Sequence, residues 1–169
     1  MVELHVQDGV AWLTLKRSEA RNALNSALIQ GFADHLNDLR TRKDVRVIVT
    51  RGEGPSFCAG SDLRELAPLS PAEAAASERE VAKALSILDT LPQPTIAMMH
   101  GHALGGGLGL AIYHDFRIAA KDTIISMPEV ALGWTPPWGI GRLMDIVGNA
   151  KTRWLLLTSS PITGAHAAE

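Results

Sequence analysis

The stretch that decides the fold is HGHALGGGLGLA, residues 100–111, in which three consecutive glycines precede an apolar run with the composition of a helix. A dinucleotide-binding fingerprint, GxGxxG/A, would need glycine or alanine where the chain has Leu110 or Ile112. A phosphate-binding P-loop beginning at Gly101 would need lysine where Gly107 stands. Both nucleotide-binding patterns therefore fail on spacing. Glycines that serve neither purpose indicate a backbone that another group approaches closely.

The composition is that of an ordinary globular chain. The 169 residues are 46% hydrophobic with a formal net charge of −2, which favours one domain with a sizeable core and gives no support for nucleic-acid binding. No apolar run reaches the roughly 18–20 residues of a membrane span, and the charged, alternating N-terminus is unlike a signal peptide. We therefore expect a cytoplasmic protein without nucleic-acid or membrane partners.

The residue types also argue against a metal site. Cys58 is the only cysteine, so no internal disulfide and no zinc site of several cysteines can form. His102 and His114 have no acidic or cysteine partner at a spacing typical of metal ligands. We expect no bound metal, and we expect Cys58 to be a small buried residue.

Segments typical of strands alternate with segments typical of helices. Asp8 and Gly9 separate two alternating runs and predict a hairpin. A helix is expected over residues 26–40 with Ser26 as its cap, and a longer helix over residues 71–91. Further strands are expected at 45–50, 95–99, 116–120 and 123–127, and further helices after the glycines and at 139–148 and 150–160. This alternation predicts an α/β domain with a mainly parallel sheet.

Two glycine-containing segments share one design. Ala59 and Gly60 precede an expected helix start at Ser61, and small residues again lead into a helix after Gly105. Helix N-termini leave unpaired N–H donors and carry the positive end of the helix dipole. Two such ends brought together would aim backbone donors at one oxygen, an oxyanion hole worth roughly 2.7–4 kcal/mol per donor. Taken singly, each segment is better explained as a tight turn.

Four segments together resemble the crotonase, or enoyl-CoA hydratase/isomerase, superfamily in their order and spacing. They are RSEARNALN (17–25), GEGPSFCAGSDL (52–63), PTIAMMHGHALGGGLGLAIYHDFRIAA (94–120) and ISMPEVALGWTPPWGIGRL (125–143). The resemblance implies a crotonase-like spiral of ββα units with a mainly parallel sheet, in one core domain over residues 1–169. It implies an acyl thioester substrate carried on coenzyme A, with no tightly bound cofactor. It also implies an oxyanion hole made by the amides of Ala59 and Gly106.

The substrate-binding residues that the resemblance implies come from the same four segments. They are Arg21, Ala23, Leu24, Ala59, Gly60, Ser61, Asp62, Leu63, Gly105, Gly106, Gly109, Trp134, Pro136 and Trp138. The basic residues Lys16, Arg17 and Arg21 stand where the family lays the adenine and phosphates of coenzyme A, although a solvated face explains them equally well. Asp62 is expected chiefly to cap a helix.

The reaction depends on the side chains opposite the hole. In hydratases of the family two glutamates hold the attacking water, and the resemblance places one at Glu129 and the other where this chain has Gly109. One carboxylate suffices to move a proton between two carbons, so this departure favours double-bond isomerisation and weakens hydration without excluding it. Pro137 stands where the family often has glycine, so a backbone donor that could hold water is lost. With bulky Trp134 and Trp138, and space freed at Gly109, we expect a reshaped acyl pocket.

Glu129 is the expected acid/base of the site. Its neighbours from Met127 to Trp138 are largely apolar, and burial among them would raise its pKa toward the range useful to a general base. His100 and His102 lie beside the expected hole, and either could supply a second acid. A hydrogen-bonded structural role is commoner for such histidines.

Other functions remain open on these residues. A decarboxylase or hydrolase of a β-carbonyl acyl-CoA would use the same hole and enolate, and Gly109 also fits a CoA-binding scaffold without activity. Family members are longer than this chain, and the resemblance implies further C-terminal helices that cover the acyl pocket and help to build a homotrimer or a hexamer of two trimers. A last helix is expected to begin after Thr163, in TGAHAAE.

Overall fold

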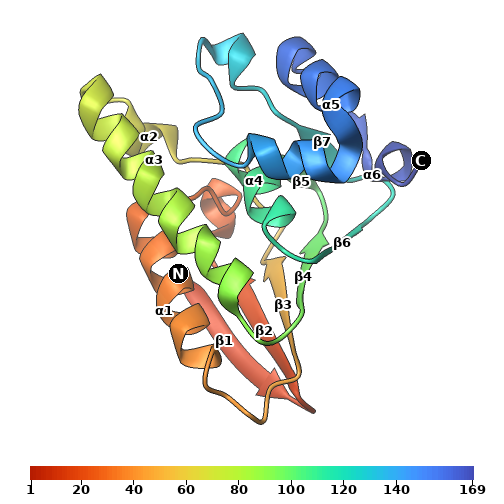
Figure 1. Ribbon diagram of the computed structural model, residues 1–169. Coiled ribbons are helices and arrows are strands. Elements are labelled where there is room, and N and C mark those ends of the chain that lie inside the picture. The colour runs from red at the N-terminus through yellow and green to blue at the C-terminus, as the bar shows by residue number, and fades with distance from the viewer.

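The computed structural model describes all 169 residues, which form two β-sheets with helices packed around them (Figure 1). The strands are β1 (Val2–Gln7), β2 (Val10–Leu15), β3 (Val47–Gly52), β4 (Thr95–Met99), β5 (His102–Leu104), β6 (Phe116–Ala119), β7 (Ile124–Ser126) and β8 (Ile162–Thr163). The larger sheet has the order β1-β2-β3-β4-β6, in which only the β1–β2 pair is antiparallel. In the smaller sheet β5 and β7 are parallel, and β8 is antiparallel to β7. The predicted α/β class with a mainly parallel sheet is confirmed.

The hairpin predicted at Asp8 and Gly9 joins β1 to β2. Both residues have positive φ, 53° and 82°, as a type I′ turn requires, and this turn matches the right-handed twist of the strands. The register places Gln7 opposite Val10. The turn therefore fixes which side chains of this edge face the core.

Helix α1 (Ser26–Leu39) packs on β1 and β2, and α3 (Pro71–Leu85) lies alongside α1 (Figure 1). The predicted cap of α1 is wrong by one residue. Oδ1 of Asn25 accepts the N–H of Leu28 at 2.9 Å, while the hydroxyl and amide of Ser26 donate to the Glu65 carboxylate. Asparagine caps helices at least as well as serine, so residue type alone could not choose between the two neighbours.

The helix predicted over residues 71–91 forms in two parts. Ser70 and Glu73 make a capping box at the start of α3, in which each side chain accepts a hydrogen bond from the other residue's backbone N–H. After Leu85 the chain tightens into the 3₁₀ helix η2 (Ser86–Thr90). One face of α3 is buried against the rest of the molecule. It consists of the apolar residues Ala74, Val81, Ala84 and Leu85 and of one carboxylate, Glu78.

The remaining helices frame the upper part of the molecule (Figure 1). They are η1 (Ser18–Ala20), α2 (Leu63–Leu66), α4 (Gly106–Ile112), η3 (Val130–Leu132), α5 (Ile140–Thr158) and α6 (Gly164–Ala167). Gly148 has φ 78° and ψ 163° and kinks α5 into two helical parts, as predicted. Thr163 caps α6 by accepting the N–H of His166 at 3.2 Å. No helix is both long and apolar enough to cross a membrane.

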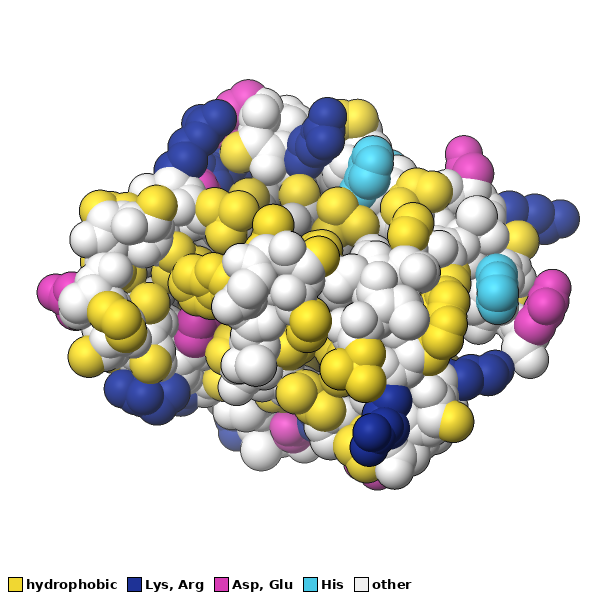
Figure 2. Space-filling model, turned by 90° about the horizontal axis from the view of Figure 1, so that it is seen from above, with side chains coloured by type: hydrophobic (Ala, Val, Ile, Leu, Met, Phe, Trp, Pro, Cys, Tyr) yellow, Lys and Arg dark blue, Asp and Glu magenta, His cyan; other side chains and the backbone are white.

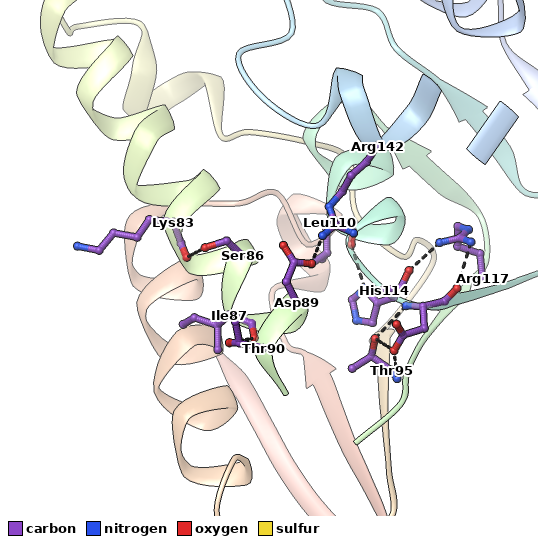
Figure 3. A network of polar contacts seen from close by, with 11 residues as sticks. Lys83, Ser86, Ile87, Asp89, Thr90, Thr95, Leu110, His114, Arg117 and Arg142 are labelled. Atoms are coloured by element: carbon purple, nitrogen blue, oxygen red, sulfur yellow. Dashed lines mark hydrogen bonds and ion pairs between the residues drawn. The ribbon is translucent and has the colours of Figure 1, made fainter. Parts of the chain in front are cut away.

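A polar network ties α4 to the sheet and α5 to η2 (Figure 3). Nδ1–H of His114 donates to the carbonyl of Leu110 at 2.9 Å, which leaves Nε2 to accept the Thr50 hydroxyl at 2.7 Å. Complete burial lowers the pKa of His114 to about 4, so the ring is neutral and structural. Arg142 forms an ion pair with Asp89 that joins the start of α5 to η2.

Gly107 and Gly141 are both helical glycines and offer a matched test of close packing. A Cβ on Gly107 would collide with the carbonyl oxygen of Cys58, whereas nothing lies within 4 Å of a Cβ on Gly141. We expect Gly107→Ala to lower the free energy of unfolding by about 1–3 kcal/mol, as overpacking does. Gly141→Ala should raise it by about 0.4–1 kcal/mol. Urea unfolding of both variants measures the difference, and equal effects would contradict the packing argument.

Candidate active site

A pocket opens between the glycine segment, α2, α3 and the loop that follows β7. Of the predicted substrate-binding residues, those that line it are Ala59, Gly60, Ser61, Leu63, Gly105, Gly106, Gly109, Trp134, Pro136 and Trp138. Two carboxylates, Glu78 and Glu129, line the same pocket. At this end of the molecule hydrophobic side chains cover much of the surface, and most charged side chains lie toward its edge (Figure 2).

The other predicted substrate-binding residues lie outside this pocket. Leu24 and Asp62 line a neighbouring groove between α1 and α3. Arg21 and Ala23 line neither hollow. The carbonyl of Arg21 accepts a hydrogen bond from the Ala59 amide, and the carbonyl of Ala23 accepts one from the Arg17 side chain. Arg21, Ala23 and Asp62 therefore hold the segments around the pocket, whereas Leu24 Cδ1 lies 3.4 Å from the place of a Cβ on Gly106, beside the two amides.

Asp62 caps α2, as predicted. Its Oδ1 accepts the N–H of Arg64 at 3.0 Å, and its Oδ2 lies 2.6 Å from the guanidinium of Arg17. Burial alone would raise the pKa of Asp62, but the bonds from Arg17 and from the Arg64 amide lower it below the usual value. Arg17 is thereby committed to a buried ion pair, which removes it from the basic residues expected to contact phosphates. Lys16 is likewise paired with Glu3 and Glu53.

The predicted oxyanion donor at Ala59 is wrong by two residues. The Ala59 N–H donates to the carbonyl of Arg21 at 3.0 Å, so it is already occupied. The Ser61 amide makes no hydrogen bond to the protein. Gly106 is the first residue of α4, so its amide has no intrahelical acceptor. The free donors are therefore the amides of Ser61 and Gly106.

At each of the three consecutive glycines a side chain is excluded for a different physical reason. Gly105 has φ 50°, and a Cβ there would lie 2.7 Å from Oε1 of Glu129. A Cβ on Gly107 would collide with the Cys58 carbonyl. A Cβ on Gly106 would lie 3.3 Å from the Ser61 nitrogen, so it would fill the space between the two free amides. Of the three, the missing side chain at Gly106 is the one that leaves space between the two free amides for an atom of a substrate.

Glu129 extends into the pocket from the loop after β7. Its Oε2 is buried and has no hydrogen-bond partner, while Oε1 lies over Gly105. Burial is the main cause that raises the pKa of Glu129; a hydrogen bond from its own backbone amide opposes it, and the negative charge of Glu78 adds a smaller increase. The predicted apolar surroundings are confirmed, since Met127, Pro128, Leu132 and Pro137 line the pocket beside it. An unpaired, desolvated carboxylate of this kind is available for proton transfer.

Glu78 is the residue that the sequence analysis missed. The Ser61 hydroxyl donates to its Oε1 at 3.1 Å, and the indole N–H of Trp138 donates to its Oε2 at 2.7 Å. Its neighbours Ser77, Arg79 and Glu80 are polar or charged, so nothing in the local sequence sets it apart. The usable signal was its spacing from Ala74 and Val81, because residues i, i+4 and i+7 share one helix face.

The ring of Trp138 occupies the space that a side chain at position 109 would need. A Cβ on Gly109 would collide with the indole ring of Trp138, so the space that we expected Gly109 to free is already filled. The ring is further held by an edge contact with Tyr113, with centroids 6.2 Å apart. Trp138 therefore fills this wall of the pocket, and Gly109 does not widen it.

The histidines beside the glycines take structural roles. His100 Nε2 lies 2.9 Å from the carbonyl of Gly54, and His102 Nδ1 lies 3.0 Å from the Ser56 hydroxyl. Neither ring lines the pocket, so neither is placed to act as a second acid. Burial raises the pKa of the Cys58 thiol to about 12, which makes it unreactive. No cluster of three or more His, Cys, Asp or Glu side chains is arranged to hold a metal ion.

Two free amides beside a desolvated carboxylate define a site that can stabilise a developing oxyanion while a proton moves next to it. Fold and site thus define a mixed α/β protein with a pocket in which backbone amides and a carboxylate face a common space. The family model described as enoyl-CoA hydratase/isomerase matches residues 5–169. This chain belongs to that family.

Relatives agree in sequence and in structure. Enoyl-CoA isomerase/hydratase fer4 of Mycosarcoma maydis is 38% identical over 171 aligned positions, which cover 95% of this chain and 62% of that protein. The mitochondrial enoyl-CoA hydratase domain-containing protein 2 of Homo sapiens is 35% identical over 161 positions, covering 94% and 55%. The crystal structure of enoyl-CoA hydratase from Bacillus anthracis matches with a TM-score of 0.94 at 30% identity, covering 98% and 66%. The crotonase fold is confirmed, and the chain spans about two thirds or less of the length of these relatives.

Proposed function

We propose that this chain forms the core of an acyl-CoA enzyme that moves a proton next to a thioester carbonyl, in double-bond isomerisation or hydration of an enoyl-CoA. The observation that carries the proposal is the meeting of three groups in one pocket. These are the unpaired amides of Ser61 and Gly106 and the unpaired carboxylate oxygen of Glu129. Coenzyme A is the carrier of the substrate, and the protein needs no resident cofactor for this chemistry.

The isomerisation step follows from this geometry. A thioester oxygen between the amides of Ser61 and Gly106 accepts two hydrogen bonds. The Glu129 carboxylate takes a proton from C2 of a 3-enoyl-CoA, and the resulting dienolate places negative charge on the oxygen that the amides hold. The Glu129 carboxylic acid then returns the proton to C4. The double bond has moved from C3 to C2, and the base is restored.

The raised pKa of Glu129 supports this role. Proton transfer is efficient when the pKa of the catalytic group lies near the working pH, and an ordinary glutamate lies well below it. Desolvation therefore gives Glu129 a stronger affinity for the C2 proton than an exposed glutamate has. The same shift would serve decarboxylation or hydrolysis less well, since neither needs a carboxylate that both takes and returns a proton.

One assay tests the proposal against its alternatives. The full-length protein is incubated separately with 2-enoyl, 3-enoyl and malonyl-type CoA thioesters in D₂O, and products are identified by mass and NMR. We expect conversion of the 3-enoyl thioester to the 2-enoyl thioester with deuterium at C2 or C4. Loss of CO₂ from the malonyl thioester without any isomerisation or hydration would assign the decarboxylase activity instead. Tight binding of all three without turnover would indicate a scaffold.

We also propose that the protein assembles as a homotrimer or as a hexamer of two trimers. Helix α5 exposes apolar side chains, Met144, Ile146, Trp154 and Leu157, with 39–63% of each residue accessible. Patches of this kind mark interaction surfaces when they are contiguous. Light scattering on the full-length protein should give a multiple of three subunits, and a stable, well-folded monomer would contradict it.

A further inference from the structure

Glu78 is a buried carboxylate without a cation. Only 6% of the residue is exposed, and none of the ion pairs in the molecule involves it. Burial of an unpaired ionisable group is costly, so a carboxylate is a poor choice for a purely structural position on the buried face of α3. Its only partners are two neutral donors, the Ser61 hydroxyl and the Trp138 indole.

Those two donors tie Glu78 to the reacting centre. Ser61 has a double role, because its hydroxyl holds Oε1 of Glu78 while its amide is one of the two free donors of the pocket. Trp138 holds Oε2 and fills the wall at Gly109. The Glu78 carboxylate is thus fixed next to the place that the thioester oxygen would occupy. Glu129 lines the same pocket from a different part of the chain.

Addition of water to a conjugated double bond asks for two proton transfers at different atoms. One group must accept a proton from water as its oxygen attacks, and another must donate a proton to the α-carbon. A single carboxylate would have to do both in succession from one position. Two carboxylates with different affinities for a proton can divide the task.

Resting on the proposed function, we propose that Glu78 is the proton acceptor for a water molecule that this site adds to a 2-enoyl-CoA thioester. Glu78 takes one proton as the water oxygen bonds to C3 and the C2=C3 π electrons move onto the thioester oxygen. The enolate collapses and takes a proton at C2 from the Glu129 carboxylic acid. The proton on Glu78 passes through solvent to the Glu129 carboxylate. Both groups are restored, and one water has been added.

The surroundings of the two carboxylates fit this division of roles. A carboxylate has about four lone-pair positions, and Glu78 uses two of them, so positions remain for water. The two hydrogen bonds that Glu78 accepts fix the direction of its carboxylate, so a water in the pocket would meet an oxygen held in place. Burial and the neighbouring charge of Glu78 raise the pKa of Glu129, so Glu129 holds a proton to donate more readily than an ordinary glutamate does.

The test compares two reactions in one variant. In Glu78→Gln, hydration of a 2-enoyl-CoA should fall about 10²–10⁴-fold, the typical contribution of a general base. Isomerisation of a 3-enoyl-CoA uses only Glu129 as its base, so it should fall at least tenfold less than hydration, although Glu78→Gln also removes a charge that helps to raise the pKa of Glu129. Glu80→Gln is the matched control, because Glu80 lies on the same helix with its side chain 73% exposed and paired only with Lys83. That control should leave both rates unchanged.

The outcomes separate this inference from the proposed function. Equal loss of both activities in Glu78→Gln, or no loss of either, overturns the role of Glu78. If that variant does not fold, Glu78→Asp keeps the charge but withdraws the carboxylate, and it should lower hydration at least tenfold while sparing isomerisation; equal losses again overturn the inference. A parent protein that isomerises but never hydrates overturns it while the proposed function stands. A parent that does neither removes both.

Discussion

Replacement of Glu129 by glutamine should lower the turnover of a 3-enoyl-CoA about 10²–10⁴-fold, the range that general acid–base catalysis contributes. The affinity for the thioester should change little, because the amides of Ser61 and Gly106 that would hold its carbonyl belong to the backbone of other segments. Solvent deuterium exchange into the substrate, measured beside turnover, reports proton transfer directly. Unchanged exchange in Glu129→Gln would show that another group moves the proton.

The pH dependence of the parent provides an independent check of the same residue. Glu129 can remove the C2 proton only when its carboxyl group is ionised. Burial and the charge of Glu78 raise the pKa of that group. The kcat/KM for isomerisation should therefore fall as the pH drops through a value above that of an ordinary glutamate. Residual activity in Glu129→Gln should lack this limb of the profile.

Replacement of Gly106 by proline should remove one oxyanion donor and narrow the space between the two amides, without removing the helix. Proline has no N–H, yet it is favoured at the first position of a helix, and α3 already begins with Pro71. Loss of one such donor typically lowers kcat about 10²–10³-fold. Steady-state kinetics with a 3-enoyl-CoA measures the loss, and thermal unfolding of the variant establishes that α4 still forms.

The outcome at Gly106 also tests the corrected position of the hole. A proline variant that is folded and retains parental kcat would exclude the Gly106 amide as an oxyanion donor. It would also contradict the assignment of the Ser61 amide as the second donor. Exchange at C2 passes through the same dienolate that the amides hold, so deuterium exchange in the proline variant should fall together with kcat.

The sequence was sufficient wherever one local rule decides the structure. Asp8 and Gly9 specify a hairpin because few other residues tolerate positive φ at two consecutive positions. The separate helical parts expected over residues 139–148 and 150–160, and the helix expected after Thr163, also form. The apolar setting of Glu129 was also predictable, since its neighbours in the chain are the residues that bury it.

The sequence was insufficient wherever the structure depends on a partner far along the chain. Ala59 and Ser61 differ in availability only because the carbonyl of Arg21 takes the first amide. Helical spacing puts Glu78 on the buried face of α3, but its position in the pocket is fixed by donors far along the chain, of which Trp138 lies 60 positions away. Residue type and spacing carry no record of such bonds.

The shared volume of Gly109 and Trp138 imposes an order on evolutionary change in this site. No residue larger than glycine fits at 109 while the indole is in place, so a carboxylate can enter there only after Trp138 has become smaller. That first exchange would also take away the N–H that holds Glu78. An evolutionary change that replaces a carboxylate at position 78 by one at position 109 therefore passes through an intermediate with a smaller residue at 138. In that intermediate Glu78 has lost one of its two donors, and position 109 does not yet carry a carboxylate.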